Sequence, residues 1–242
     1  GHVSTGYQAG YSQTSGGTNT NIGYQAGYSN TTNGENVNVG HSAGKTATGS
    51  QNVAVGRNAF GDGFGHSGIG NAVLGYLALS SPSGASNYNV AIGSQALKGN
   101  GTKSNNVAVG YQAGFAVTTG ADNTIIGYEA GLSVTNSSSN TVLGHNALGY
   151  HNGNTNVAIG GNAMVGSASF TGTGTDNVAI GYNAGGAGAT AYSNSILIGK
   201  DAATSPLGQS NFIVLGNSSH TTFQIPGIQS GASDGDVLTY NA

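Results

Sequence analysis

Ring-bearing side chains recur at one position of a repeated motif, directly after a glycine, and they have the clearest capacity for chemistry in this sequence. They are Tyr7, Tyr24, His41, Tyr76, Tyr111, Tyr128, His145 and Tyr182. Tyrosine offers a large apolar ring with a hydroxyl at its tip, so an outward-facing ladder of such rings suits contact with a sugar or a surface polymer. The other interpretation is a ladder that stacks on itself and seals a corner of the fold.

Ionisable residues show no pattern typical of an active site. The eight acids are Glu35, Asp62, Asp122, Glu129, Asp176, Asp201, Asp234 and Asp236. Glycoside cleavage needs two convergent carboxylates, and the Asp234/Asp236 pair lies in a Gly/Ser-rich tail that predicts a solvated turn. The six histidines lack the close spacing of a metal site, and there are no cysteines. We therefore expect no catalytic residues, no metal and no cofactor.

Charge excludes further classes of partner. The net charge is −3, and the five basic residues, Lys45, Arg57, Lys98, Lys103 and Lys200, are spread over the length of the chain. Nucleic-acid binding needs a basic patch, so we expect no nucleic-acid partner. No run of apolar residues approaches the length of a membrane span, so we expect no membrane insertion.

A short repeat positions these residues. Thirteen glycines recur at spacings of 16 to 21 residues, and an alanine stands three residues after each of the first twelve. The unit reads Asn-x-x-aliphatic-Gly-x-x-Ala, as from Asn156 to Ala163. A period this short is the signature of a solenoid.

Each unit carries a short run rich in β-branched residues, such as 89–92 and 106–109, with turn-forming residues between the runs. Helix is implausible at this glycine density. We therefore predict an all-β parallel solenoid of about 13 rungs, which extends for roughly 58 Å at the usual strand spacing.

Side chains alternate between the two faces of a strand, and here both faces are apolar, which predicts burial on both. We assign the residue before each glycine, and the one two earlier, to the interior of the coil. The residues between them then form an exposed stripe that another chain must cover, most economically in a parallel homotrimer. The predicted trimer interface is Ala54, Val73, Ala91, Ala108, Ile125, Val142, Ala158 and Ala179.

An asparagine stands four residues before ten of the glycines, from Asn19 to Asn177. A stacked amide ladder, in which each side chain bonds to turn backbone or to the next rung, explains this column without a ligand.

The unit Asn-Val-Ala-Ile-Gly-x-x-Ala, at 89–96, 156–163 and 177–184, resembles the head repeats of trimeric autotransporter adhesins. The variant Gly-Tyr-Gln-Ala-Gly-Tyr/Phe, at 6–11, 23–28 and 110–115, is similar to repeats of bacteriophage tail-fibre and other virion appendage proteins. The resemblance implies a left-handed β-roll wound into a homotrimer, with an adhesive or receptor-binding role on a virion or an extracellular surface. The repeat spacing is longer than in adhesin heads, and the ending lacks their Lys-rich neck, which favours the tail fibre.

We expect a β-roll repeat domain at 1–216 and a C-terminal connecting segment at 217–242. The predicted function is a non-enzymatic trimeric rod whose partners are its own copies, other fibre segments and a host-surface glycan or protein. A bacterial adhesin head and a tailspike-type polysaccharide depolymerase are the alternatives. Contact residues are expected in the ladder and in the longer turns, where loops carry function. They are Tyr24, Tyr76, Tyr111, Tyr128, Tyr182, Phe64, His66, Tyr88 and Phe170.

Overall fold

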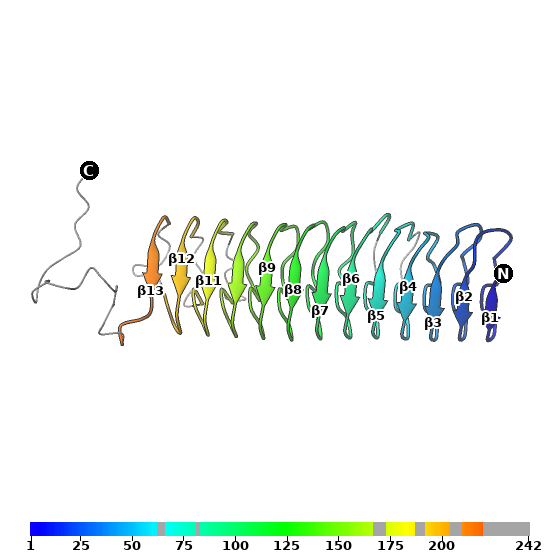
Figure 1. Ribbon diagram of the computed structural model, residues 1–242, viewed down its shortest axis with the longest axis horizontal. Coiled ribbons are helices and arrows are strands. Elements are labelled where there is room, and N and C mark those ends of the chain that lie inside the picture. The colour runs from blue at the N-terminus through cyan, green and yellow to red at the C-terminus, as the bar shows by residue number, and fades with distance from the viewer. Residues whose placement is uncertain (62–65, 81–82, 167–172, 187–191, 204–209, 220–242) are drawn as a thin grey trace, which may run out of the picture.

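The protein is an all-β parallel solenoid, seen in a computed structural model that describes residues 1–61, 66–80, 83–166, 173–186, 192–203 and 210–219. In these ranges thirteen strands of three residues each fall on the thirteen repeats and form one sheet in sequence order (Figure 1). The strands are β1 Val3–Thr5, β2 Thr20–Ile22, β3 Val37–Val39, β4 Val53–Val55, β5 Ala72–Leu74, β6 Val90–Ile92, β7 Val107–Val109, β8 Thr124–Ile126, β9 Thr141–Leu143, β10 Val157–Ile159, β11 Val178–Ile180, β12 Ile196–Ile198 and β13 Ile213–Leu215.

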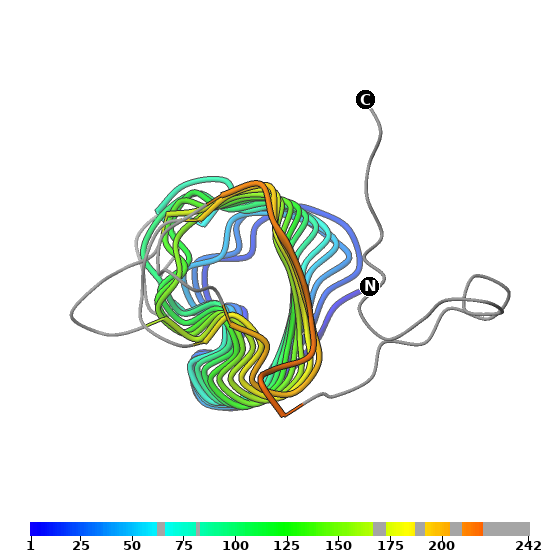
Figure 2. The ribbon, with the colours of Figure 1, turned by 90° about the vertical axis from the view of Figure 1, so that its left-hand side faces the viewer.

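The strands pair in parallel with equivalent residues in register, so that Ala91 lies beside Ala108 and Ala108 beside Ile125. Each strand is one side of a coil, and turn segments form the return path, so the coils superpose when viewed end-on (Figure 2). The predicted parallel β-solenoid is thus confirmed.

The glycine after each strand lets successive coils approach closely. At Gly110 the φ angle is 137°, and an added Cβ would lie 2.3 Å from the carbonyl oxygen of Gly127 on the next coil. Such a contact is far inside the normal separation of nonbonded atoms, and the φ value is one that L side chains rarely adopt. The repeated glycine is therefore required by the stacking of the backbone.

The interior of the coil lies on the face opposite to the one predicted. The middle residue of each strand points inward, whereas the first and third residues point outward. Our assignment of the eight middle residues to a trimer interface is wrong, because their side chains are buried inside a single chain. These residues are Ala54, Val73, Ala91, Ala108, Ile125, Val142, Ala158 and Ala179.

The inward side chains are small because the return path of the coil fills the same narrow space. In the β6 unit the strand contributes the small Ala91 to the interior, and the return path contributes the buried Leu97. At β8 the larger Ile125 accompanies Gly131, where an added Cβ would lie 3.2 Å from Ile125 Cδ1. In these two units a large side chain from one wall of the coil is combined with a small residue from the other.

The asparagine column forms the predicted amide ladder. Asn106 Nδ2 donates to the carbonyl oxygen of Gly120 at 2.9 Å. Asn106 Oδ1 accepts from the backbone nitrogen of Asn123 at 3.0 Å and from Asn123 Nδ2 at 2.9 Å. The backbone nitrogen of Ser195 continues the column by donating to Asn177 Oδ1 at 3.1 Å. These buried amides hold turn and strand of neighbouring coils together.

The predicted connecting segment at 217–242 is described only for residues 217–219. Asp234 and Asp236 therefore lie outside the described residues, as do Phe64 and Phe170 in the longer turns.

Candidate functional site

The predicted ring ladder exists and lies on the outer surface, just beyond the strands. Tyr7 stacks on Tyr24 at a centroid distance of 5.3 Å, and Tyr24 stacks on His41 at 4.8 Å. Further along, Tyr128 lies between Tyr111 at 5.2 Å and His145 at 5.4 Å. The tyrosine rings nevertheless remain between 40% and 64% exposed. The rings thus stack on one another and also face solvent, and contact with a sugar stays a prediction.

Backbone geometry after each strand turns the rings outward. In the β8 unit, Gly127 has a φ of 140°, Tyr128 follows, and Glu129 has a φ of 52°. Ala130 then points into the interior and is fully buried. The residue two after the glycine also reaches the ring on its own rung, because a hydrogen bond with the Glu129 carboxylate, together with its charge, raises the pKa of Tyr128.

Stacking decides which part of each ring a ligand can reach. Neighbouring rings are nearly parallel, with interplanar angles from 9° to 20° in the four ladder pairs. A stacked ring has its faces covered and presents its edge to solvent. Ring faces therefore become available only where the ladder is interrupted.

The ladder lacks a ring at three rungs. Arg57 stands between His41 and Tyr76, and the two further rungs carry only a small residue. Ser94 stands between Tyr76 and Tyr111, and Gly161 stands between His145 and Tyr182. The Tyr76 ring is covered by Arg57, whose guanidinium lies over it at 5.8 Å from the ring centroid. Sequence analysis missed the break at Gly161. The signal was present in the sequence, because the repeat glycine Gly160 is followed by a second glycine and not by a ring.

The remaining predicted contact residues do not belong to this ladder. Tyr88 is exposed but precedes β6, at the opposite end of that strand from Ser94. His66 is fully buried and stacks on Phe60 at 5.5 Å, so its assignment to a receptor-binding surface is wrong. Phe64 and Phe170 lie outside the described residues. The structure therefore groups Tyr24, Tyr76, Tyr111, Tyr128 and Tyr182 on one face and separates them from the others.

A second, shorter ring column follows four residues later. Tyr11 stacks on Tyr28 at 5.2 Å, and Lys98 Nζ lies over the Phe115 ring at 5.7 Å from its centroid. This column covers fewer rungs than the main ladder.

The outward residues of the strands form a second notable surface, which we call the outer face. Ile92 is 37% exposed, Leu74 50% and Leu143 47%, whereas Ala91 beside Ile92 is fully buried. The outer face has two apolar columns. The first residues of the strands supply Val37, Val53, Val90, Val107, Val157, Val178, Ile196 and Ile213. The third residues supply Ile22, Val39, Val55, Leu74, Ile92, Val109, Ile126, Leu143, Ile159, Ile180, Ile198 and Leu215.

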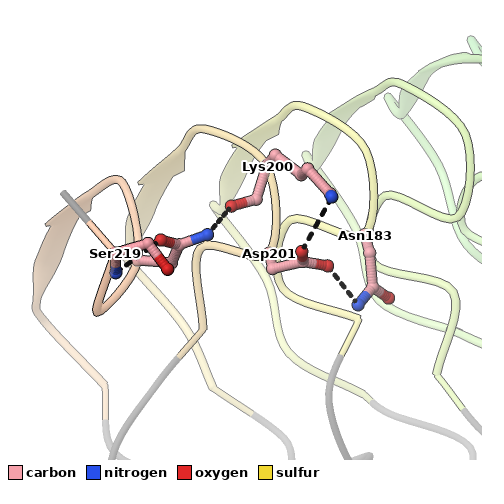
Figure 3. Close-up of polar contacts among 5 residues, drawn as sticks. Asn183, Lys200, Asp201 and Ser219 are labelled. Atoms are coloured by element: carbon pink, nitrogen blue, oxygen red, sulfur yellow. Dashed lines mark hydrogen bonds and ion pairs between the residues drawn. The ribbon is translucent and has the colours of Figure 1, made fainter.

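Described acids bond to side chains of neighbouring rungs. Glu35 accepts from Gln51 at 3.0 Å, and Asp122 accepts from Asn105 at 3.1 Å. Asp201 accepts from Asn183 at 3.0 Å and lies 3.8 Å from the Lys200 ammonium (Figure 3). Among the described residues no group of three or more His, Asp or Glu side chains is placed to hold a metal ion.

Besides His66 and Tyr192, the described part of the chain buries Lys103 and His151 inside the coil. Burial lowers the pKa of Lys103 to about 7, and its ammonium donates to the carbonyl oxygens of Gly99 and Val117. Burial also lowers the pKa of His151 to about 4, and neither ring nitrogen has a hydrogen bond within the described part of the chain. Neither group faces solvent, so neither is placed to act on an external substrate.

Comparison with known proteins finds no matching family model, no matching curated protein and no matching solved structure. In the described ranges there is also no helix with the length and apolar character needed to cross a membrane.

Proposed function

We propose that this protein is a non-enzymatic structural and adhesive fibre, a homotrimeric rod of a phage tail fibre or similar virion appendage that attaches to a host-surface glycan or protein. The observation that carries the proposal is the outer face, because its third-residue column is isoleucine, leucine or valine in every strand from β2 to β13. At the usual strand spacing it runs for roughly 58 Å. Soluble monomers rarely expose a continuous apolar patch of more than a few hundred Å².

A three-fold arrangement fits the width of the outer face. The face is two side chains wide, so in a parallel trimer the column of first residues contacts one neighbour and the column of third residues contacts the other. Equivalent rungs then meet in register around the axis, which closes the assembly and leaves no apolar column exposed. The proposed interface replaces the middle residues named from the sequence with Val107, Val109 and their equivalents.

The ring ladder supplies the adhesive surface in this proposal. It follows the third residue of each strand by two positions, at the border of the outer face, and its tyrosine edges and hydroxyls face solvent. The left-handed winding of the coil and its place in a virion appendage rest on the resemblance of the repeats. The same resemblance keeps a bacterial adhesin head as the second candidate.

The assembly is tested by sedimentation equilibrium of the protein and of an Ile92→Glu/Leu143→Glu variant. We expect the unsubstituted chain to sediment as a trimer. The variant should sediment as a monomer with unchanged β-sheet circular dichroism, because a trimer would bury six carboxylates, three at each of two rungs, and this is not possible without neutralisation. The matched control is Asn100→Glu, an exposed turn residue, which should remain trimeric. A monomeric unsubstituted protein at micromolar concentration would contradict the proposal.

The adhesive role is tested by labelled protein on panels of bacterial cells and their purified surface polysaccharides. Retention on at least one surface without release of new reducing ends is expected. Release of reducing ends would instead support a depolymerase.

A further inference from the structure

The interruption of the ladder at Gly161 leaves an opening with an aromatic ring on each side. His145, Gly161 and Tyr182 follow β9, β10 and β11, and these three strands are paired in register. They therefore occupy the same place on three consecutive rungs. Rings on adjacent rungs elsewhere stack at 5.2 or 5.4 Å, as for the Tyr111, Tyr128 and His145 set. At Gly161 the middle ring of such a set is missing.

Tyr182 borders this opening and is more exposed than rings inside the ladder. It is 55% exposed, compared with 44% for Tyr24 and 49% for Tyr128, which both have a ring on each side. An added Cβ on Gly161 would lie 3.4 Å from Cδ2 of the Tyr182 ring. Gly161 therefore places no side chain against this ring. Tyr111, which borders the Ser94 break, is only 40% exposed, so the greater exposure is particular to Tyr182.

We propose that this opening, which we call the Gly161 slot, binds one neutral pyranose ring between His145 and Tyr182. Two rungs separate the walls by about 9.6 Å. Carbon–carbon contacts of about 3.5 to 4.0 Å on each side use roughly 7 to 8 Å of this distance. About 2 Å remains for the thickness of the ligand. One ring fits such a place elsewhere in the ladder, since Tyr128 stacks on both Tyr111 and His145. The slot therefore has room for a single six-membered ring, and the polar groups beside it favour a sugar.

Polar groups beside the slot suit sugar hydroxyls. Asn162 is the next residue and corresponds to Glu129, which reaches the hydroxyl of Tyr128 on its own rung. Asn146 Nδ2 donates to Asn162 Oδ1 at 3.3 Å. Asn162 Nδ2 makes no hydrogen bond to any part of the chain that the structure describes, so it is placed to donate to a hydroxyl of the sugar. Small-molecule sites commonly combine apolar walls with a few such polar groups.

Charge beside the slot favours a neutral sugar. Lys200 occupies the ladder position beyond Tyr182, and its ammonium lies 3.8 Å from the carboxylate of Asp201 (Figure 3). Asp201 also accepts from Asn183, so the three side chains form a compact and electrically balanced group. The slot admits one ring, so it recognises a terminal or branch residue of a glycan.

This inference rests on the proposed adhesive function and names the ligand class of its ring ladder. The probe is a panel of methyl hexopyranosides, with p-cresol as a flat-ring probe and methyl glucuronide as an anionic one, measured by saturation-transfer NMR. We expect transfer to at least one neutral pyranoside and little to the other two probes.

Gly161→Tyr completes the ladder and should lower this transfer about tenfold, because the added ring occupies the slot. The substitution is compatible with the fold, since Gly161 does not adopt a positive φ and its Cβ position is in ordinary contact distance of Tyr182. The matched control is Ser94→Tyr, which fills the other break and should leave transfer unchanged. Tyr182→Ala removes one wall and should also lower it.

Three results would overturn the slot. The first is that pyranoside transfer is the same in Gly161→Tyr as in the unsubstituted protein. The second is an equal loss in Ser94→Tyr, and the third is preferential transfer to p-cresol or methyl glucuronide. A protein that attaches to cells but shows no transfer to any pyranoside would overturn the slot and leave the adhesive function standing. A protein that binds pyranosides at Gly161 but attaches to no cell surface would support the slot and contradict the adhesive function.

Discussion

The two faces of the single sheet carry apolar side chains of different sizes, and the smaller ones are inside. The middle residues of the strands are mostly alanine and valine and are buried, as Ala91 and Val142 illustrate. The outer face carries isoleucine, leucine and valine, and Ile92 and Leu143 are exposed beside them. In most proteins the larger apolar residues are the buried ones. In the strands of this protein that order is reversed, and the proposed trimer would bury the larger residues.

The return path supplies many of the larger buried side chains. The strand and the return path are close enough for the Ala113 column and the middle residues to share one interior cluster. In the β4 unit the return path contributes Phe60 and the strand contributes Ala54. In the β9 unit both walls contribute a branched side chain, Val142 and Leu148. The interior is therefore filled from both walls, in proportions that differ from unit to unit.

The sharpest test of this comparison places the same charge on adjacent residues of β6. Ala91→Glu buries a carboxylate inside the coil without a partner and should cost about 4 kcal/mol or more, enough to remove the β-sheet signal in circular dichroism. Ile92→Glu places the carboxylate on the outer face, so the isolated coil should keep that signal while the oligomer weakens. If the two variants keep equal β-sheet signals, the assignment of the faces is wrong.

Sequence alone predicted the strands, their parallel pairing and the amide ladder, because each follows from local pattern repeated at a fixed period. It could not decide which face lies inside. A period of two shows that Val90 and Ile92 lie opposite Ala91, but the choice between inside and outside depends on the width of the coil. That width is set by the return path, which has no strand pattern to identify it.

The sequence predicted the ring column of the candidate site but not the burial of His66. The repeat placed Tyr111, Tyr128 and Tyr182 in one column, since register follows from the period. His66 was assigned to the surface because it lies in a long turn, yet its segment bridges Ala47 and packs its ring on Phe60. The bridge to Ala47 joins residues from neighbouring coils, and no local sequence pattern predicts it.

Acid titration tests a second property of the inner face, its exclusion of charge. The pKa of His151 is about 4 in the folded chain and 6.5 in its ordinary state. The unfolded chain therefore binds a proton that the folded chain does not, so stability contributed by neutral His151 is lost as the pH falls from 6.5 to about 4. The loss amounts to about 3 kcal/mol.

Chemical denaturation of the protein and of a His151→Leu variant at several pH values measures this loss. The difference in unfolding free energy between the two should change across that window and stay constant above it. A His151→Leu difference that does not vary with pH would mean that His151 is accessible to solvent when folded.

The smallest effect is expected in the polar column of the inner face. Asn106→Ala removes the acceptor of the Asn123 backbone nitrogen and the donor to the Gly120 carbonyl oxygen, and it leaves both groups buried. Unsatisfied buried groups of this kind should cost about 2 kcal/mol in urea denaturation. The matched control is Asn136→Ala, because Asn136 Oδ1 accepts from Thr118 and Thr119 at an exposed position where water replaces it. If Asn136→Ala lowered the unfolding free energy as much as Asn106→Ala, the inner column would be no more shielded from water than the surface. The contrast between the two sides of the coil would then be limited to its apolar residues.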